Sequence, residues 1–178
     1  DENYLIYADD ATYLKNEEMF LTRGQSKAIN EGFLIDADNF RYNKIANTLN
    51  ANGNVKMEDT INDYLVFAND ATYFKNSKKV ITKGNTDALI QSRYDVNSKD
   101  VTYLHNERIL TSENKTKIKD KNSSRFYYFN EKFKYHMDQE LIKGKKTIII
   151  TNYNLPQSDK FFLENAIINL KDKKFIAA

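Results

Sequence analysis

A segment near the start of the chain returns almost unchanged sixty residues later. Residues 4–13 read YLIYADDATY, and residues 64–73 read YLVFANDATY. Of the 27 aligned pairs between residues 4–30 and 64–90, 12 are identical. Repetition of this kind is typical of stacked units that cannot bury an apolar face alone. We therefore expect neighbouring copies to share one continuous core.

The sixty-residue offset contains two copies of a unit of about thirty residues. Each of the first three copies has an alanine that is followed five residues later by a tyrosine and sixteen residues later by a glycine. These columns are Ala8, Tyr13 and Gly24; Ala37, Tyr42 and Gly53; and Ala68, Tyr73 and Gly84. Looser copies contain Ser98, Tyr128 and Leu163 in the alanine column. About six copies therefore predict a single domain over residues 1–178 that ends inside a repeat.

The composition narrows the classes of function. With 40% hydrophobic residues and one proline, the chain can form a packed core rather than a disordered segment. Its 27 basic and 25 acidic residues are interspersed, which argues against nucleic acid as a partner. The absence of cysteine excludes disulfides and thiolate metal sites. No apolar run approaches the roughly 18 residues of a membrane helix, and the lack of an initiator Met or signal peptide predicts a mature or excised fragment.

Apolar residues recur at every second position within each copy, which predicts β-strands and argues against helices. The first strand of a copy has a step of three in its middle, and an extra residue there is typical of a β-bulge. The bulge positions are Asp9-Asp10, Asp38-Asn39 and Asn69-Asp70. Looser versions of the same inward phase are Phe126, Tyr128, Glu131 and Phe133 in the fifth copy, and Phe161, Leu163, Ala166 and Ile168 in the sixth.

A polar turn and a second strand complete each copy. We expect turns at residues 15–18, 75–78, 105–108 and near 130–133, with Lys15 and Lys75 facing outward. The glycine column falls inside the second strand, and in the fourth copy it holds Asn114. Because Asn tolerates positive φ best after Gly, this column predicts a backbone bend. A loop insertion is expected near residues 152–160.

These features predict an all-β fold, an open β-jelly roll or folded-sheet stack of about six strand–turn–strand repeats. Each copy crosses from one wall of the stack to the other, so the inward positions line a trough. The tyrosine column suits an ordinary core and the wall of a lipid groove equally well. The predicted groove residues are Ile6, Tyr13, Ile35, Phe40, Tyr42, Val55, Met57, Val66, Tyr73, Val80, Val96, Val101 and Tyr103.

No catalytic constellation emerges from the sequence. His105 and His136 are the only histidines, and we interpret both as solvated turn residues. Asp9-Asp10 and Asn69-Asp70 resemble a carboxylate cluster, but Asp38-Asn39 occupies the same column, and repetition along a stack indicates a structural role. The chain has no nucleotide-binding or hydrolase motif. We therefore expect no enzyme activity, no catalytic residue, no cofactor and no metal.

The pattern apolar-x-Ala-Asp-x-x-x-Tyr, a polar turn, then apolar-x-x-x-Gly-Asn resembles the OstA-type repeat of lipopolysaccharide-transport proteins. It stands here as Ile6–Tyr13 with Gly24-Gln25, Ile35–Tyr42 with Gly53-Asn54, and Val66–Tyr73 with Gly84-Asn85. Within this OstA-like family the chain is most similar to the LptD group, in its N-terminal periplasmic domain, and the periplasmic bridge group LptA is the alternative. Members of the LptD group often carry cysteines that link domain to barrel. This chain has none, which favours the alternative.

The resemblance implies a non-catalytic periplasmic domain, associated with the outer membrane, that shields the acyl chains of lipopolysaccharide (its lipid A part) and passes the lipid on. It also implies head-to-tail contact with another OstA-like domain such as LptA. For a chain of the LptD group it implies contact with the LptD barrel and its lipoprotein partner. The sequence starts on a full-strength repeat, so we expect the partner edge strand to contain Tyr4, Ile6 and Ala8.

Two other classes remain open. A structural or adhesive β-solenoid would keep the repeats but fill the interior with packed side chains, so the lack of a cavity for an acyl chain would favour it. A polysaccharide-processing enzyme would need a non-repeated carboxylate cluster in a cleft, and the sequence offers none.

Overall fold

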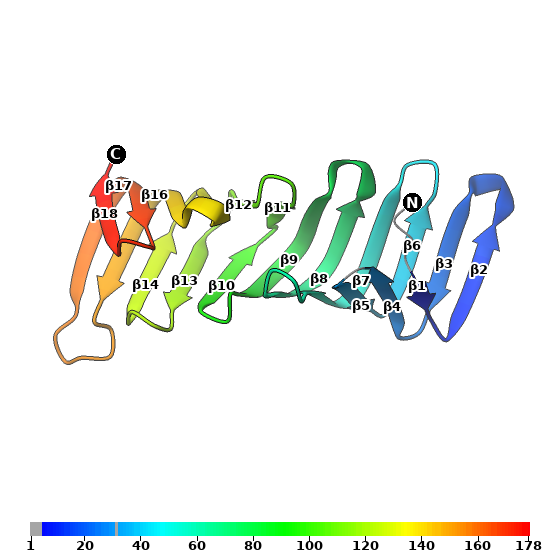
Figure 1. Ribbon diagram of the computed structural model, residues 1–178, viewed down its shortest axis with the longest axis horizontal. Helices are drawn as coiled ribbons and strands as arrows, with labels where there is room; N and C mark the ends of the chain where they lie inside the picture. Colours follow the sequence, from blue (N-terminus) through cyan, green and yellow to red (C-terminus); the bar gives the residue numbers. More distant parts are fainter. Residues whose placement is uncertain (1–4, 31) are drawn as a thin grey trace.

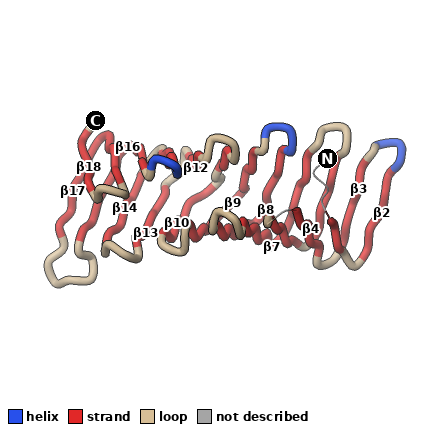
Figure 2. Tube along the Cα trace, in the orientation of Figure 1, coloured by secondary structure: helices blue, strands red, loops and turns tan. Residues whose placement is uncertain are grey.

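The computed structural model describes residues 5–30 and 32–178, which form strands and three short 3-10 helices (Figures 1 and 2). The strands are β1 (Leu5–Tyr7), β2 (Asp10–Leu14), β3 (Met19–Arg23), β4 (Ser26–Asn30), β5 (Phe33–Ala37), β6 (Asn39–Asn43), β7 (Thr48–Asp59), β8 (Tyr64–Phe74), β9 (Lys79–Ile90), β10 (Tyr94–Lys99), β11 (Thr102–Leu104), β12 (Ile109–Ser112), β13 (Thr116–Asp120), β14 (Arg125–Phe129), β15 (Phe133–His136), β16 (Leu141–Thr151), β17 (Asp159–Asn169) and β18 (Lys174–Ala177). The 3-10 helices are η1 (Lys15–Glu17), η2 (Lys75–Ser77) and η3 (Met137–Gln139). Within the described ranges, no helix has the length and hydropathy needed to cross a membrane.

The strands belong to one sheet, which folds lengthwise into two walls that face each other across an apolar interior. The first wall contains β1, β4, β5, β10, β13 and β14, and the second contains β2, β3, β6, β11, β12, β15 and β18. The long strands β7, β8, β9, β16 and β17 run through both walls. We call the line where the chain crosses between walls the bend line. The two opposite margins, where turns join strands of one wall, are the rims.

The chain crosses the bend line by irregular backbone, as a strand must when a sheet folds sharply. The β8–β9 register shifts between Ala68 and Asp70, which brackets the bulge position at Asn69. In the first two copies the strand is interrupted, so that residues 8–9 lie between β1 and β2, and Asp38 lies between β5 and β6. The predicted extra residue therefore marks the fold between the walls.

Side chains alternate between the two faces of each strand, and the apolar face of each wall points inward. One core cluster is built around Ile35, Phe40 and Val55, and a second extends from Tyr64 to Leu170. Ile168 in the sixth copy is 1% exposed, and the loop of residues 152–158 separates β16 from β17 near the expected insertion. Partly buried Val66 packs against both clusters, so the core is continuous along the stack.

The fifth copy departs from the predicted phase. Tyr127 and Phe129 are each 1% exposed, whereas Phe126 and Tyr128 lie on the outer face, where both contact the Lys117 ammonium group. The step between the inward positions Phe129 and Phe133 across the bend line is four positions rather than three, so the phase of β14 is displaced by one. The turn expected near residues 130–133 lies instead at η3.

The glycine column has two physical origins. Gly53 and Gly84 have φ of 72° and 80°, a conformation that favours glycine. Gly144 has no positive φ, and a Cβ there would collide with the Phe129 ring. The expectation of positive φ at Asn114 is wrong. Its backbone N–H and side-chain amide instead donate hydrogen bonds to Ser112 Oγ and the Lys99 carbonyl oxygen, which hold the bend.

Replacing Gly53 by valine is expected to lower the free energy of unfolding by about 1–3 kcal/mol, because a β-branched residue at positive φ is strained. The new Cβ would also meet the Asp38 carboxylate. Urea unfolding followed by circular dichroism measures the change. Gly53→Asn is the matched control and should cost less, since Asn tolerates positive φ. An unchanged midpoint for the valine variant would contradict the backbone requirement.

Candidate functional site

At the N-terminal end the interior forms a chamber of about 530 Å³. Ile6, Tyr13 and Phe20 occupy inward positions here but remain 41%, 45% and 40% exposed. The rings of Tyr13 and Phe20 stack with centroids 4.4 Å apart, and both belong to the second wall. The chamber is lined by Ile6, Ala11, Phe20, Thr22, Ala28, Tyr42, Asn47, Leu49, Tyr73 and Lys75.

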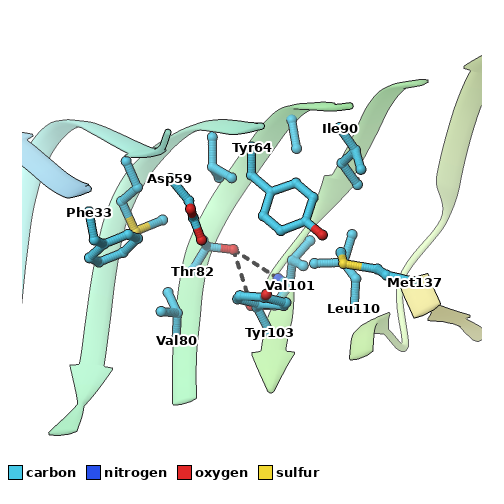
Figure 3. A pocket seen from close by; sticks show the side chains of 13 residues that line it. Phe33, Asp59, Tyr64, Val80, Thr82, Ile90, Val101, Tyr103, Leu110 and Met137 are labelled. Carbon is cyan, nitrogen blue, oxygen red and sulfur yellow. Dashed lines mark hydrogen bonds between the residues drawn. The ribbon is translucent and has the colours of Figure 1, made fainter. Parts of the chain in front are cut away.

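Near the middle of the molecule the interior narrows to a cavity of about 50 Å³ (Figure 3). Two polar side chains in its lining, Thr82 and Asp59, are engaged by backbone groups. Thr82 Oγ1 accepts a hydrogen bond from the Val101 N–H at 2.9 Å, and the Asp59 carboxylate accepts from the N–H groups of Ile61 and Asn62. The remaining lining is apolar or aromatic: Phe33, Met57, Tyr64, Val66, Val80, Ala88, Ile90, Val101, Tyr103, Leu110 and Met137.

Aromatic pairs bridge the two walls from the central section to the C-terminal end. Edge-to-face and tilted ring pairs contribute about 0.5–1.5 kcal/mol each beyond burial. The bridging pairs and their centroid distances are Phe33–Tyr73 at 6.2 Å, Tyr64–Tyr103 at 5.9 Å, Tyr94–Tyr135 at 6.4 Å and Phe161–Phe175 at 5.0 Å.

Two arginines join the rims over this bridged section. The Arg108 guanidinium, on the second wall, donates hydrogen bonds to Asn62 Oδ1 at 2.5 Å and to the Tyr64 hydroxyl at 3.0 Å on the first. Arg125, on the first wall, donates to the Lys173 carbonyl oxygen at 2.8 Å. The trough is therefore roofed along these contacts, while the N-terminal chamber lies beyond them.

An ion pair fixes two turns of the first-wall rim. Arg93 donates to Asp120 through Nε at 2.9 Å and through a terminal nitrogen at 2.8 Å, and the Asn122 N–H and Ser123 hydroxyl donate to the same carboxylate. Burial alone would raise the pKa of Asp120, but these hydrogen bonds outweigh it and hold the pKa below its ordinary value of 3.8. The carboxylate is therefore charged at neutral pH although its side chain is only 2% exposed.

The structure places all the predicted groove residues on the inner side of the walls. Those toward the middle are buried, whereas at the N-terminal end Ile6 lines the chamber and Tyr13 stacks on Phe20, and both stay exposed. The fully buried members are Ile35, Phe40, Val55, Met57, Val80, Val96 and Val101, and the partly buried ones are Tyr42, Val66, Tyr73 and Tyr103. The predicted groove residues do not include Phe20 and Ala28, although the alternation of the second strand contains the signal for both.

Lys75 corrects one expectation. Its place in a turn predicted an outward side chain, yet it lines the chamber mouth. A turn at the rim borders the interior as well as solvent, and the sequence pattern does not distinguish these two sides.

The histidines and the acidic column form no cluster suited to catalysis. His105 is exposed in a rim turn, and burial together with Lys134 and Lys143 lowers the pKa of His136. In the acidic column, Asp38 accepts hydrogen bonds from the Asn54 side chain across the bend line. Across residues 5–30 and 32–178, no group of acidic and histidine side chains is placed to hold a metal ion.

Both ends of the stack leave strands with one partner. Among the described strands, β1 pairs with β4 alone and β2 with β3 alone, while at the other end β18 pairs only with β17. Apolar side chains are exposed at both ends, among them Leu5 at 60%, Phe162 at 73% and Ile176 at 60%. Of the predicted partner strand, Ile6 lies in β1, Ala8 lies at the bend line, and Tyr4 falls outside the described residues.

The two-walled antiparallel stack, open at one end and edged by unpaired strands, has counterparts among solved structures. One is the crystal structure of LptH from Pseudomonas aeruginosa, described as the LptA-homologous periplasmic component of the conserved lipopolysaccharide transport device. It matches with a TM-score of 0.57 at 11% sequence identity, over 61% of this chain and 80% of that one. The likeness is one of fold. No family model and no curated protein sequence matches the chain.

Proposed function

We propose that this domain is a non-catalytic carrier that shields the acyl chains of lipopolysaccharide within the trough and passes the lipid toward the outer membrane. The observation that supports it most is the N-terminal chamber, a largely apolar space of about 530 Å³ with inward residues that stay exposed. Each methylene removed from water contributes about 0.8 kcal/mol, so hiding a chain of roughly a dozen carbons is worth on the order of 10 kcal/mol. An open-ended trough supplies that burial while polar groups remain in water.

The fold shared with LptH supports a place in the periplasm. Within the OstA-like family we propose an N-terminal LptD domain at the outer membrane, in contact with the barrel and its lipoprotein partner, and the bridge group LptA is the alternative. A structural or adhesive solenoid is less well supported, because such a role does not require an open apolar chamber.

The unpaired strands support head-to-tail stacking with another OstA-like domain. Each end of the stack has one edge strand in each wall. At the N-terminal end these are β1 and β2, and at the C-terminal end they are the first half of β17 and the strand β18. A second domain placed end to end would extend both walls by strand addition and cover the exposed apolar residues. The trough would then continue from one domain into the next.

Introducing a charge into the chamber tests the lipid-binding proposal. Phe20→Asp is expected to weaken binding of lipid A by about tenfold or more, because the carboxylate must lose water when acyl chains enter. Phe67→Asp is the matched control, since Phe67 is 47% exposed on the outer face and Phe20 is 40% exposed inside. Binding is measured by displacement of a fluorescent fatty acid, after melting curves establish that both variants are folded. Equal affinities for the two variants would contradict the proposal.

A further inference from the structure

Three tyrosine hydroxyl groups in the roofed section have no hydrogen-bond partner among the described residues. They belong to Tyr94, Tyr103 and Tyr135. Tyr94 and Tyr135 are each only 1% exposed. A buried polar group that lacks a partner costs about 1–3 kcal/mol, and the large majority of such groups in folded proteins are bonded. Three unpartnered hydroxyls in one section of one trough therefore need a physical explanation.

These tyrosines, with Tyr64, form a row that crosses the trough. The rings pair between walls, Tyr64 with Tyr103 and Tyr94 with Tyr135. Tyr64 and Tyr94 are the first residues of β8 and β10, so they directly follow turns of the first-wall rim. The Tyr64 hydroxyl already has a rim partner in Arg108, at 3.0 Å.

The row separates two environments. Next to the row, on the side toward the bend line, lie aliphatic side chains that include Val96, Ile118 and Ile149. At the rim are charged groups, including Arg93 and Arg108, which act electrostatically on the Tyr135 hydroxyl. Tyrosine suits such a boundary because its ring is apolar and its hydroxyl is a hydrogen-bond donor. An amphiphile whose chains lie in the trough also has a boundary, where its hydrocarbon chains meet oxygen-bearing linkages. That boundary would lie level with the tyrosine row.

We propose that the tyrosine row, Tyr64, Tyr94, Tyr103 and Tyr135, is a hydrogen-bonding subsite for the carbonyl or hydroxyl oxygens at the roots of bound acyl chains. The inference rests on the proposed lipid-carrier function and adds a chemical selectivity to it. A hydroxyl at the row donates to an ester or amide carbonyl, which a plain alkyl chain lacks. Burial raises the pKa of Tyr94, Tyr103 and Tyr135, so these groups keep the proton that they donate.

A chain that reaches the row must enlarge the cavity of about 50 Å³ beside it. Met57 and Met137 are part of its lining. Their unbranched thioether side chains change rotamer readily and fill irregular space. A chain that enters at the N-terminal chamber would displace them and slide beneath Arg108, which brings its linkage oxygen to Tyr64 and Tyr103.

The test removes the hydroxyls and keeps the rings, in a variant that combines Tyr94→Phe, Tyr103→Phe and Tyr135→Phe. Two probes with twelve-carbon chains are compared below their micelle-forming concentrations: sucrose monolaurate, which carries an ester carbonyl, and dodecyl maltoside, which does not. The wild-type protein should bind both. The triple variant should lose about tenfold in affinity for the ester and none for the alkyl glycoside.

Tyr128→Phe is the matched control, because Tyr128 lies on the outer face beside Lys117, and it should leave both affinities unchanged. Equal affinity of the triple variant and wild type for the ester would overturn the subsite and leave the carrier function standing. Equal losses for both probes would also overturn it, by showing that the effect of the hydroxyls does not depend on a carbonyl group in the ligand. Failure of the wild-type protein to bind either probe would overturn the carrier function itself.

Discussion

Asp120→Ala is expected to lower the free energy of unfolding at neutral pH by about 3 kcal/mol, the largest loss of stability that we anticipate from a single substitution. The change leaves the Arg93 guanidinium, whose side chain is 23% exposed, without its carboxylate partner. Breaking one side of a buried ion pair typically costs about 3–5 kcal/mol, and the partial exposure of Arg93 places this case at the lower end. Two turns of the first-wall rim also lose their common acceptor.

The effect should depend on pH in a defined direction. Because the folded-state pKa of Asp120 lies below its ordinary value of 3.8, the stabilisation is present above that value and is lost as pH falls through the folded pKa. Wild type and variant should therefore differ by a constant amount from pH 5 upward and converge in more acidic solution. Asp95→Ala, which breaks the exposed Lys121–Asp95 pair nearby, should cost less than about 1 kcal/mol. A similar cost for both substitutions in urea titrations would contradict the assignment.

A proline in β2 is expected to weaken head-to-tail self-association by about tenfold to a hundredfold, because it removes a backbone donor from the edge that we propose pairs with the next domain. Successive N–H groups alternate between the two sides of a strand. Ala11→Pro and Thr12→Pro are therefore made in parallel, and one of the two removes a donor on the free side. Sedimentation equilibrium measures the association.

Thr12→Val is the control for that experiment, since it changes the same side chain and keeps its N–H group. Circular dichroism checks that each variant is folded. Self-association of both proline variants with the affinity of the valine control would place the junction at another surface. Selective loss in one proline variant would also identify which residue of β2 directs its donor outward.

The strand phase could be predicted wherever the two faces of a strand differ in composition. Residues 70–73 alternate between polar and apolar side chains, and the structure places Ala71 inside the core. In β14 the residues at 126–129 are all aromatic, so alternation carries no information about which face is inward. In the structure, one extra residue at the bend shifts the strand so that Tyr127 and Phe129 face inward. The periodic pattern does not contain that residue.

The roof of the trough was beyond sequence reasoning for a different reason. Arg108 contacts Asn62, which is 46 residues away in the sequence, and Arg125 contacts Lys173, which is 48 residues away. These contacts depend on how closely the two walls approach, and that distance is set by ring packing across the interior. The repeat predicts which residues face inward in every copy except the fifth. It does not determine where the trough closes.

The backbone at the bend line differs between the N-terminal end and the central section of the trough, so we expect these two parts to differ in stiffness. At the N-terminal end, β1 and β2, and β5 and β6, are separate strands joined through interrupted backbone, whereas β7, β8 and β9 pass through the fold as continuous ribs. Interrupted crossings act as hinges, and continuous strands resist changes in the angle between walls. The entrance is thus expected to widen or narrow with its cargo while the ribs hold the central angle constant. The volume of the entrance would then increase with the number of acyl chains that the domain carries.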